Sequence, residues 1–433
     1  DCESLADVEA RGMAKLADTA AERERRVAET KRESIATYAY TSGTTGAPKG
    51  VIQTHANWLA ILEVTPELGL FTEATRKHGG FLFLPLAHSF GRLIELSCVF
   101  NGGPAVLASI PTLAEDLAKS RPGLFPAAPR VYEKIYARIM AGLASAPPSR
   151  QRLFSWALSV GKQALPYRRR GKSLPLLLAL QHRLAERLAF KKIRARLGFD
   201  HLESAVSGSA PLAPVVHDFF MAIGIMLIEG YGLTETCPVL TANRLDHWKL
   251  GTVGTPIRNV VIKIAPDGEI LAKGPNVTQG YLNRADANAE AFDAEGWFHT
   301  GDIGEIDGEG FLRITDRKKD LLKTSGVKYI APIKIEGMLK AIPMVTEAVV
   351  IGDNRKYCTA LLVLDDDGVE AWAKRTGNPP DRKHPALLAA LQKGIDEVNR
   401  ELASVESIKY FRVIKEAFSV DNGLLTASFK VKR

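Results

Sequence analysis

A run of ten residues rich in glycine and hydroxyl side chains constrains this chain more than any other feature. Glycines reach backbone conformations that other residues avoid, so successive N–H groups can turn toward an anion, and hydroxyls add further donors. A lysine near the end of the run supplies a positive charge. The composition therefore predicts a phosphate-binding loop rather than a surface turn. The run is Thr41-Ser42-Gly43-Thr44-Thr45-Gly46-Ala47-Pro48-Lys49-Gly50.

The residues on either side of this loop predict where it lies in a fold. The apolar segment 35–40 is typical of a strand, and the segment from Thr54 is typical of a helix, so we expect the loop to join two buried elements. It is not a Walker A loop, because that motif needs Gly-Lys-Ser/Thr, whereas Pro48 precedes Lys49 and Gly50 follows it. The loop therefore belongs to another class of phosphate-binding sequence.

The segment from Tyr40 to Gly50 resembles the nucleotide loop of adenylate-forming enzymes, which activate a carboxylic acid with ATP as an acyl-adenylate. Within that group, residues 295–323 are similar to the signature of fatty-acyl ligases and differ from luciferases and amino-acid-activating domains. The match runs from about Tyr40 to Arg433. The resemblance therefore points to the long-chain fatty-acid CoA ligases.

The resemblance implies a nucleotide site in the loop and in a second motif, residues 229–236. In that motif Tyr231 stacks on adenine beside Gly232, Thr234 contacts phosphate, and Glu235 helps to hold Mg²⁺. Magnesium usually takes one or two carboxylates together with substrate oxygens. From the residues alone, a strand end with a glycine turn remains an equal interpretation of this motif. In the loop, the implied ATP contacts are Thr41, Ser42, Gly43, Thr44, Thr45, Gly46 and Lys49, with Thr44 as a second candidate metal ligand.

Three further stretches receive roles by the same resemblance. The small-residue turn Ser209-Ala210-Pro211 lies against adenine, where small side chains permit a close backbone approach. Asp302 accepts from the ribose hydroxyls, and Arg317 donates to the same sugar. His88, after the apolar run 81–86, lines the acyl site and gates access to the α-phosphate. A histidine satisfied inside a core is the competing interpretation of His88.

The C-terminal part of the chain holds the remaining implied residues. Lys430 would meet the carboxylate and the α-phosphate, where a mobile ammonium offsets the repulsion between two anions. Lys319 would be the hinge of a mobile domain, and Gly326 would line the path of the CoA thiol. A solvated basic tail is the competing interpretation of Lys430, and Phe429 stands where many relatives carry glycine.

The order of apolar runs predicts a layered α/β fold in two domains. Residues 1–317 are expected to form a large adenylation domain with parallel strands, lacking the leading segment that relatives carry and including a β-rich part at about 250–316. Residues 318–433 are expected to form a small, mobile α+β cap. The expected elements are strands 260–264, 269–272, 311–314, 346–351 and 358–364, and helices 333–341 and 385–402.

Charge and cysteine content bear on partners and location. The formal net charge is +8, and segment 150–196 is rich in Arg and Lys with the single acid Glu186. Leucines at helical spacing from 174 to 197 predict an amphipathic helix with a cationic side. Three roles compete for this cationic side, and a merely solvated helix face is the first of them. Contact with an anionic membrane surface is the second. Nucleic acid comes last, because no aromatic residues are interleaved with the charge.

The location follows from what the sequence lacks. No apolar run approaches the roughly 18 to 20 residues of a membrane span. The scattered cysteines Cys2, Cys98, Cys237 and Cys358 argue against a structural zinc or a disulfide framework. A reducing cytosol fits best, with the inner face of a membrane as a peripheral alternative.

The expected function is ATP-dependent activation of a long-chain fatty acid to an acyl-adenylate, followed by thioester formation with CoA. The implied partners are the fatty acid, ATP, Mg²⁺ and CoA. Two alternatives stay open: an acyl-AMP ligase that delivers to a carrier protein, and a catalytically impaired relative that binds lipid or nucleotide. Acyl-chain length, oligomeric state and activity without the leading segment are not determined by the residues.

Overall fold

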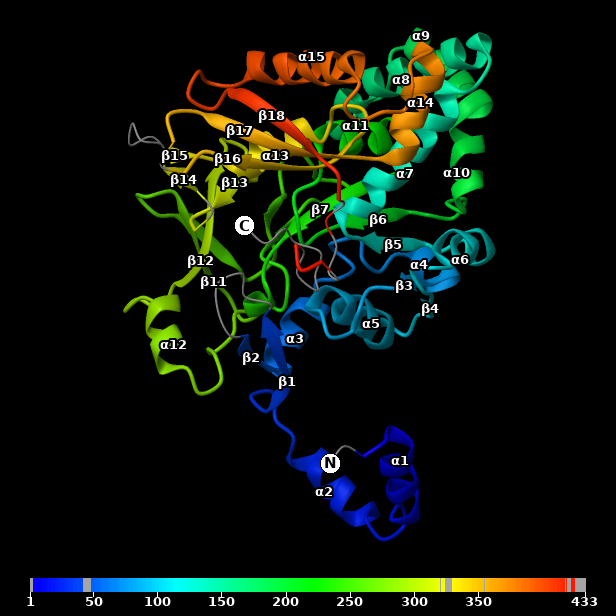
Figure 1. Cartoon of the computed structure of the whole chain (residues 1–433). Helices are drawn as coiled ribbons and strands as arrows, with labels where there is room; N and C mark the ends of the chain where they lie inside the picture. The colour runs from blue at the N-terminus through cyan, green and yellow to red at the C-terminus, as the bar shows by residue number, and fades with distance from the viewer. Residues whose placement is uncertain are drawn as a thin grey trace.

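The computed structural model describes residues 3–41, 48–319, 321–323, 329–353, 355–416, 418 and 422–424 (Figure 1). Its body is built on a seven-stranded sheet with the order β4-β3-β5-β6-β7-β8-β9. The strands from β3 to β7 pair in parallel, and β8 and β9 are antiparallel. The strands are β3 (Gly80–Leu82), β4 (Ala105–Leu107), β5 (Leu124–Ala127), β6 (Ser204–Ser207), β7 (Leu227–Tyr231), β8 (Thr241–Ala242) and β9 (Thr255–Pro256).

Helices pack against this sheet through two apolar clusters. One cluster joins Phe125 of β5 to Tyr132 and Phe220 of the helices α7 and α11, and the Tyr132 hydroxyl donates to the Phe125 carbonyl at 2.7 Å. The other includes Trp58 and Leu93 of α3 and α5. Helices that cover a mostly parallel, buried sheet define the α/β class, so the predicted fold class is confirmed. The helices are α3 (His55–Leu62), α4 (Glu73–His78), α5 (Ser89–Asn101), α6 (Leu113–Ser120), α7 (Pro129–Ala144), α8 (Pro148–Arg169), α9 (Leu176–Ala185), the π-helical turn η1 (Glu186–Phe190), α10 (Lys191–Leu197) and α11 (Pro214–Ala222).

The glycine-rich run lies between two strands of a hairpin, not between a strand and a helix. The strand β1 (Ile35–Thr41) pairs antiparallel with β2 (Lys49–Thr54), so that Thr41 faces Lys49. Helix α3 begins at His55, and the Thr54 side chain caps it in a capping box. The expectation of two buried flanking elements is wrong for β1, which is largely exposed, whereas β2 is buried.

The β-rich part is an antiparallel sheet with the order β10-β11-β12-β13. Three of its strands were predicted, whereas β12 reads in the sequence as a glycine turn. Gly301 has a φ of +71°, and the β12–β13 register shifts between Ile303 and Gly304, so glycines interrupt the alternation by which a strand is predicted. The elements are β10 (Val261–Ile264), β11 (Glu269–Lys273), α12 (Ala285–Ala291), β12 (Phe298–Ile306) and β13 (Leu312–Arg317).

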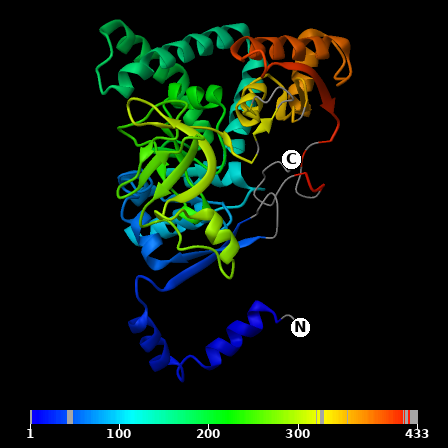
Figure 2. The ribbon, with the colours of Figure 1, turned by 90° about the vertical axis from the view of Figure 1, so that its left-hand side faces the viewer.

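The elements after residue 320 form their own core, and we call them the C-terminal unit. In its sheet, β16 and β17 pair antiparallel, while β17 and β18 pair in parallel. Its α+β composition agrees with the sequence, although α14 and β18 were not predicted. Figure 2 shows the unit at one end of the molecule. Its elements are β14 (Leu322–Lys323), β15 (Tyr329–Ile330), α13 (Pro332–Leu339), β16 (Val345–Ile351), β17 (Cys358–Leu364), α14 (Asp366–Thr376), α15 (Pro385–Glu401) and β18 (Ile408–Ile414).

Charged contacts connect the C-terminal unit to α7. Arg130 lies 3.5 Å from Glu347, and Glu133 lies 3.7 Å from Lys340. Burial raises the pKa of Glu133, and the nearby Lys340 partly offsets that shift. The two α7 residues are three positions apart and carry opposite charges, so the paired contacts favour one orientation of the unit on α7.

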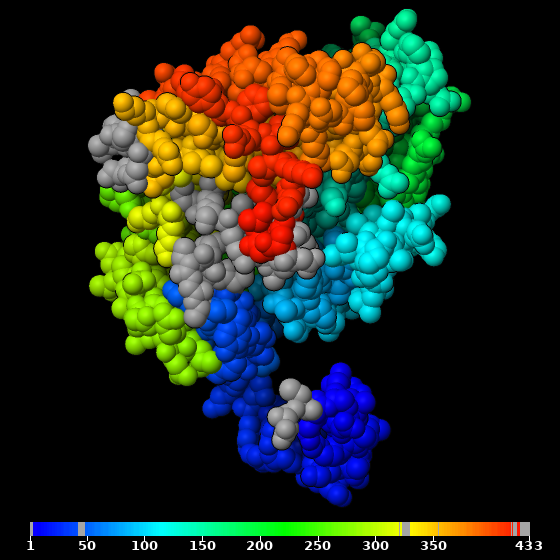
Figure 3. Space-filling model, viewed as in Figure 1, coloured from blue at the N-terminus to red at the C-terminus, as the bar shows by residue number. Residues whose placement is uncertain are grey.

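Two helices precede the first strand. Figures 1 and 3 show α1 (Leu5–Ala14) and α2 (Ala20–Glu29) beside the body rather than packed into it. Neither helix has a buried residue, and Arg25 pairs with Glu22 and Glu29 on the surface of α2. Such exposed pairs stabilise a helix only slightly. Throughout the described residues, none of the helices combines the length and apolar character that crossing a bilayer requires.

Candidate active site

A cleft of about 3540 Å³ opens at the carboxyl ends of the parallel strands and extends to the C-terminal unit. This edge is where open α/β sheets bind ligands. Its walls include every predicted site residue that the structure describes. These are Thr41, Lys49, His88, Ser209, Ala210, Pro211, Tyr231, Gly232, Thr234, Glu235, Asp302, Arg317 and Lys319. The predicted residues Ser42, Gly43, Thr44, Thr45, Gly46, Gly326 and Lys430 lie outside the described residues.

Asp302 is the centre of one group of contacts in this cleft. Its carboxylate accepts from the Tyr231 hydroxyl at 2.8 Å and from Arg317 Nε at 3.0 Å. Burial and the neighbouring Asp302 charge raise the pKa of Tyr231 well above its usual value, so its hydroxyl remains a donor. Asp302 and Arg317 are direct partners across β12 and β13. The sheet register therefore explains why Asp302 and Arg317, 15 positions apart in the sequence, lie next to each other in the cleft.

Glu235 is the centre of a second group, which includes a residue that the sequence did not reveal. The Tyr281 hydroxyl donates to Glu235 Oε1 at 2.9 Å, and Lys49 Nζ lies 4.9 Å from the centroid of the Tyr281 ring. Burial and the Glu235 charge raise the pKa of Tyr281. Tyr281 thus remains a hydroxyl donor that fixes the glutamate. No sequence signal marks Tyr281, because it follows a turn and is 46 positions from its partner.

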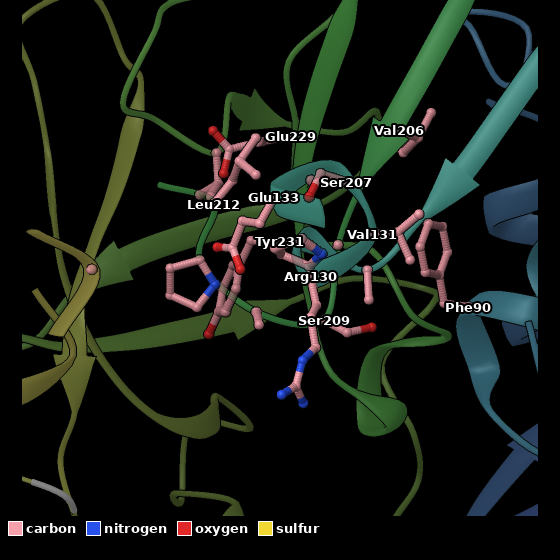
Figure 4. A pocket seen from close by; sticks show the side chains of 18 of the residues that line it. Phe90, Arg130, Val131, Glu133, Val206, Ser207, Ser209, Leu212, Glu229 and Tyr231 are labelled. Atoms are coloured by element: carbon pink, nitrogen blue, oxygen red, sulfur yellow. The ribbon is translucent and has the colours of Figure 1, made fainter. Parts of the chain in front are cut away.

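The turn 209–211 and strand β7 meet in the same cleft. Figure 4 shows Ser209, Tyr231 and Glu229 projecting from neighbouring segments around the pocket. Ser209 has a φ of +73°, a left-handed conformation that is uncommon for a residue with a side chain. Such conformations cluster at binding sites, where the surrounding structure maintains them.

Behind Glu229 lies a buried contact between this carboxylate and a histidine ring. His217 Nδ1 is 2.8 Å from Glu229 Oε1, and the other ring nitrogen is 2.9 Å from the Leu227 carbonyl. Burial lowers the pKa of His217, but the hydrogen bond and charge of Glu229 outweigh that effect, so the net shift is upward. The pair fixes a carboxylate in the cleft wall two residues before Tyr231.

His88 is a helix cap rather than a core histidine. It is the N-cap residue of α5, and its Nδ1 accepts from the Phe90 N–H at 3.2 Å. The ring is half-buried and lines the cleft. The contact with Phe90 orients the ring, and the gating role of His88 stays a prediction.

The residues just before the predicted hinge are held by ion pairs and hydrogen bonds. Lys318 Nζ lies 2.7 Å from Asp267 and 2.8 Å from Glu269, and both contacts raise the pKa of Lys318. Asp316 is fully buried and accepts from the Ile333 N–H, in the first turn of α13, at 3.2 Å. Lys319, the next residue, is exposed at the cleft.

The acidic residues of the cleft bear on metal binding. Among the described residues, no three His, Cys, Asp or Glu side chains form a group that could hold a metal ion. Glu235 is 9% exposed, and one of its oxygens is engaged by Tyr281. One carboxylate that shares an ion with phosphate oxygens is a typical arrangement for Mg²⁺. The residues therefore fit a magnesium ion that arrives with a nucleotide.

Family models match most of the chain. The AMP-binding enzyme model matches residues 3–282, and the model of the AMP-binding enzyme C-terminal domain matches residues 319–422. The chain therefore belongs to the AMP-binding enzyme family, the adenylate-forming enzymes.

Curated relatives point to one branch of this family. A long-chain-fatty-acid–CoA ligase, FadD15, of Mycobacterium bovis is 36% identical over 94% of this chain and 68% of its own length. A putative fatty-acid–CoA ligase, fadD11, of Mycobacterium tuberculosis is 38% identical over 93% of this chain and 71% of its own length. The resemblance to long-chain fatty-acid CoA ligases is thus confirmed.

Solved structures share the fold. The adenylation domain of a carboxylate reductase from Mycobacterium chelonae superposes with a TM-score of 0.68 at 25% identity, covering 93% of this chain and 58% of the other. O-succinylbenzoate Coenzyme A Synthetase of Bacillus subtilis, solved with ATP and a magnesium ion, gives a TM-score of 0.63 at 26% identity, covering 93% of this chain and 70% of the other. The chain spans 58% of the first of these solved chains and 70% of the second.

The Asp302 contacts lead to a first prediction. Replacing Asp302 with asparagine should raise the KM for ATP about 10- to 100-fold, because a buried charged acceptor for Arg317 and Tyr231 is lost. Initial rates of pyrophosphate release across an ATP series measure the change. Asp307→Asn is the matched control, since Asp307 lies on the same hairpin and pairs with Lys249 outside the cleft. Equal effects of the two substitutions would contradict the assignment.

Proposed function

We propose that this chain joins a long-chain fatty acid to CoA, with ATP cleaved to AMP and pyrophosphate and an acyl-adenylate as the intermediate. The observation that carries the proposal is the single cleft in which Lys49, Glu235, Asp302 and Arg317 meet. The names of the curated relatives support the fatty acid and CoA as substrates.

In the first step, a carboxylate oxygen of the acid bonds to the α-phosphorus of ATP, and the bond from that phosphorus to the pyrophosphate oxygen breaks. Asp302 accepts from the ribose hydroxyls, and Arg317 holds Asp302 while facing the same sugar. Glu235 would hold Mg²⁺, whose charge neutralises the phosphates when bound. By resemblance, Lys430 brings a positive charge to the two reacting anions.

In the second step, the CoA thiol attacks the acyl carbonyl, the thiol proton is lost, and AMP leaves. Lys430 serves the first step and the thiol path along Gly326 serves the second, so we infer that the C-terminal unit turns between them about Lys319. The chain divides there into the proposed domains 1–317 and 318–433. Exposed Lys319 follows directly on Lys318, which is paired to β11 and the turn before it.

The hinge proposal predicts that the two steps respond differently to one substitution. Lys319→Pro fixes the backbone φ and should slow thioester formation at least about 10-fold, while pyrophosphate release stays within about twofold. Single-turnover assays of each step provide the measurement. Lys319→Ala is the control, because it removes the charge without fixing the backbone. An unchanged thioester rate in the proline variant would remove the hinge assignment.

The apolar wall of the cleft supports a long acyl chain as substrate. Beyond the nucleotide residues, the cleft continues between α7, α8 and α10. Its volume of about 3540 Å³ exceeds the roughly 300 to 1,000 Å³ of an ordinary small-ligand pocket, so it has room for a nucleotide and an extended chain. The apolar side chains on this part of the wall are Ile139, Leu143, Leu153, Phe154, Ile193 and Leu197.

Pyrophosphate release across a series of fatty acids, with and without CoA, tests the proposal. We expect release that depends on the acid, and acyl-CoA only when CoA is added. Adenylate formed without transfer to free CoA would favour a carrier protein as the acceptor. If ATP binds but no acid gives pyrophosphate release, the result would favour the alternative of a catalytically impaired relative that binds lipid or nucleotide.

We also propose that the basic segment 150–196 makes peripheral contact with a membrane. Its exposed cations include Arg183 on α9, Arg187 on η1, and Lys191, Lys192 and Arg196 on α10. Location in the cytosol, at the inner face of a membrane, is proposed on the same grounds, and nucleic acid is not a proposed partner.

A further inference from the structure

A row of exposed leucines follows the outer face of the helix formed by α9 and η1. Leu176 is 80% exposed, Leu180 is 58% exposed and Leu184 is 49% exposed. Residues four positions apart share one face of a helix, so these side chains form a continuous apolar stripe. Leu177 and Leu188 extend it, at 69% and 36% exposed. We call these five leucines the leucine stripe.

The inner face of the same helix is packed against the body of the molecule. Ala185, Ala189 and Phe190 are buried in the main core, against which the helix packs. The leucine stripe is therefore additional apolar surface that the fold itself does not cover. Figure 1 shows α9 at the outer edge of the molecule, beside α8 and α10.

Cations accompany the stripe along the helix, and no exposed acid lies between residues 176 and 197. The only acid between residues 176 and 197 is Glu186, which is half-buried and pairs with Arg194. The Arg194 guanidinium also donates to the Ile223 carbonyl at 2.7 Å, so both residues are turned toward the body. The exposed cations of this face are Arg183, Arg187, Lys191, Lys192 and Arg196.

We propose that the leucine stripe docks the chain on an anionic lipid bilayer, with the leucines in the interface and the cations on the lipid phosphates. Leucines combined with Arg and Lys on one exposed helix face are typical of helices that lie in the plane of a membrane. Each cation near an anionic surface adds to the attraction. The inference rests on the proposed membrane contact of segment 150–196 and names the residues that make it.

The charges favour lipid over other occupants of this face. A second copy docked symmetrically would bring identical rows of cations together, which repel each other. A nucleic acid would meet the cations but leave the leucines in contact with polar groups, and the face carries no exposed aromatic ring for stacking. An anionic bilayer accommodates both the leucines and the cations.

The docked face lies close to the acyl wall of the cleft. Leu188 belongs to the stripe and also lines the cleft, where Ile193 and Leu197 follow it five and nine positions later. One helical segment thus separates the proposed bilayer from the cavity proposed for the acyl chain. Docking through this segment would place that wall of the cavity beside the lipid that holds the substrate.

Vesicle binding tests the proposal directly, without ATP or substrate. The probe is vesicles of about equal parts phosphatidylglycerol and phosphatidylcholine, with pure phosphatidylcholine vesicles for comparison. The wild-type chain should co-sediment with the anionic vesicles and release as salt rises. The triple change Leu177→Ser, Leu180→Ser and Leu184→Ser should lower the partition coefficient at least about 10-fold. The triple change Arg183→Gln, Arg187→Gln and Lys191→Gln should lower it about 100-fold.

Leu107→Ser is the matched control, since Leu107 is a 78% exposed leucine on β4 and should not affect vesicle binding. Binding that is absent in the wild type, or lost equally with Leu107→Ser, overturns the proposal. So does a lipid-free dimer that dissociates in the leucine variant, because the occupant is then a second copy. Preferential binding of RNA by the wild type, abolished in the cation variant, overturns it in favour of nucleic acid.

The same variants separate this inference from the proposed function. The leucine variant should retain pyrophosphate release with a shorter, water-soluble acid, because none of its three changed residues lines the cleft. Vesicle binding by a wild-type chain that releases no pyrophosphate would leave docking intact and refute the ligase. Ligase activity without vesicle binding would refute docking alone.

Discussion

Glu235→Gln should lower acid-dependent pyrophosphate release by about 100-fold or more. Glutamine keeps the shape of the side chain and can still accept from the Tyr281 hydroxyl, but it carries no negative charge for Mg²⁺. Losing one electrostatic group that acts on the transition state typically costs about 10²- to 10³-fold in rate. The rate measured across a magnesium series gives the effect, and the half-saturating magnesium concentration should rise.

Two controls separate charge from position in this experiment. Tyr281→Phe leaves the Glu235 charge and removes only the hydroxyl that fixes it, so the loss should be about 10-fold at most. Glu305→Gln removes a glutamate whose side chain is 63% exposed on β12, paired with Arg313, and should change nothing. A Glu235→Gln variant with an unaltered magnesium requirement would show that this carboxylate does not hold the ion.

Lys430→Ala should reduce adenylate formation by about 100-fold while sparing thioester formation from supplied acyl-adenylate. The lysine is assigned by resemblance and lies outside the described residues. By that resemblance, its ammonium would be needed only where the carboxylate and the α-phosphate, both negative, approach each other. Single-turnover assays measure the two steps separately, one starting from fatty acid and ATP and the other from supplied acyl-adenylate and CoA.

A neighbouring lysine provides the control for this variant. Lys432→Ala removes the same charge two positions further along and should leave both steps close to the wild-type rates. Equal losses in both steps with Lys430→Ala would mean that the residue supports the fold of the tail or a shared step. In that case the assigned role is wrong.

The sequence predicted those features that depend on local pattern. Short apolar runs such as the one around Phe81 became buried parallel strands, because their length and composition allow little else. Strand β2 was missed, because Gly50 and the polar Gln53 weaken its pattern and the capped helix follows at once. Strand β12 was missed for a similar reason, since Gly301 and Gly304 resemble a turn.

Contacts between distant segments could not be predicted in the same way. Asp302 and Arg317 were matched by motif, and only the β12–β13 register explains their proximity. Tyr281 carried no signal, because its contact with Glu235 depends on how the chain returns over 46 positions. The α7 contacts Arg130–Glu347 and Glu133–Lys340 join parts of the chain about 200 positions apart, and neither pair has a motif.

Asp316 and Arg317 are adjacent residues whose side chains contact different parts of the molecule. Arg317 holds the aspartate proposed for the ribose, whereas Asp316 caps the first turn of α13 in the C-terminal unit. Because the two residues share one peptide unit, we propose that occupancy of the ribose site is coupled to docking of the C-terminal unit. By reciprocity, if docking of the unit raises the affinity for the nucleotide by some factor, the bound nucleotide favours docking by that same factor, and release of the spent nucleotide would then accompany movement of the unit.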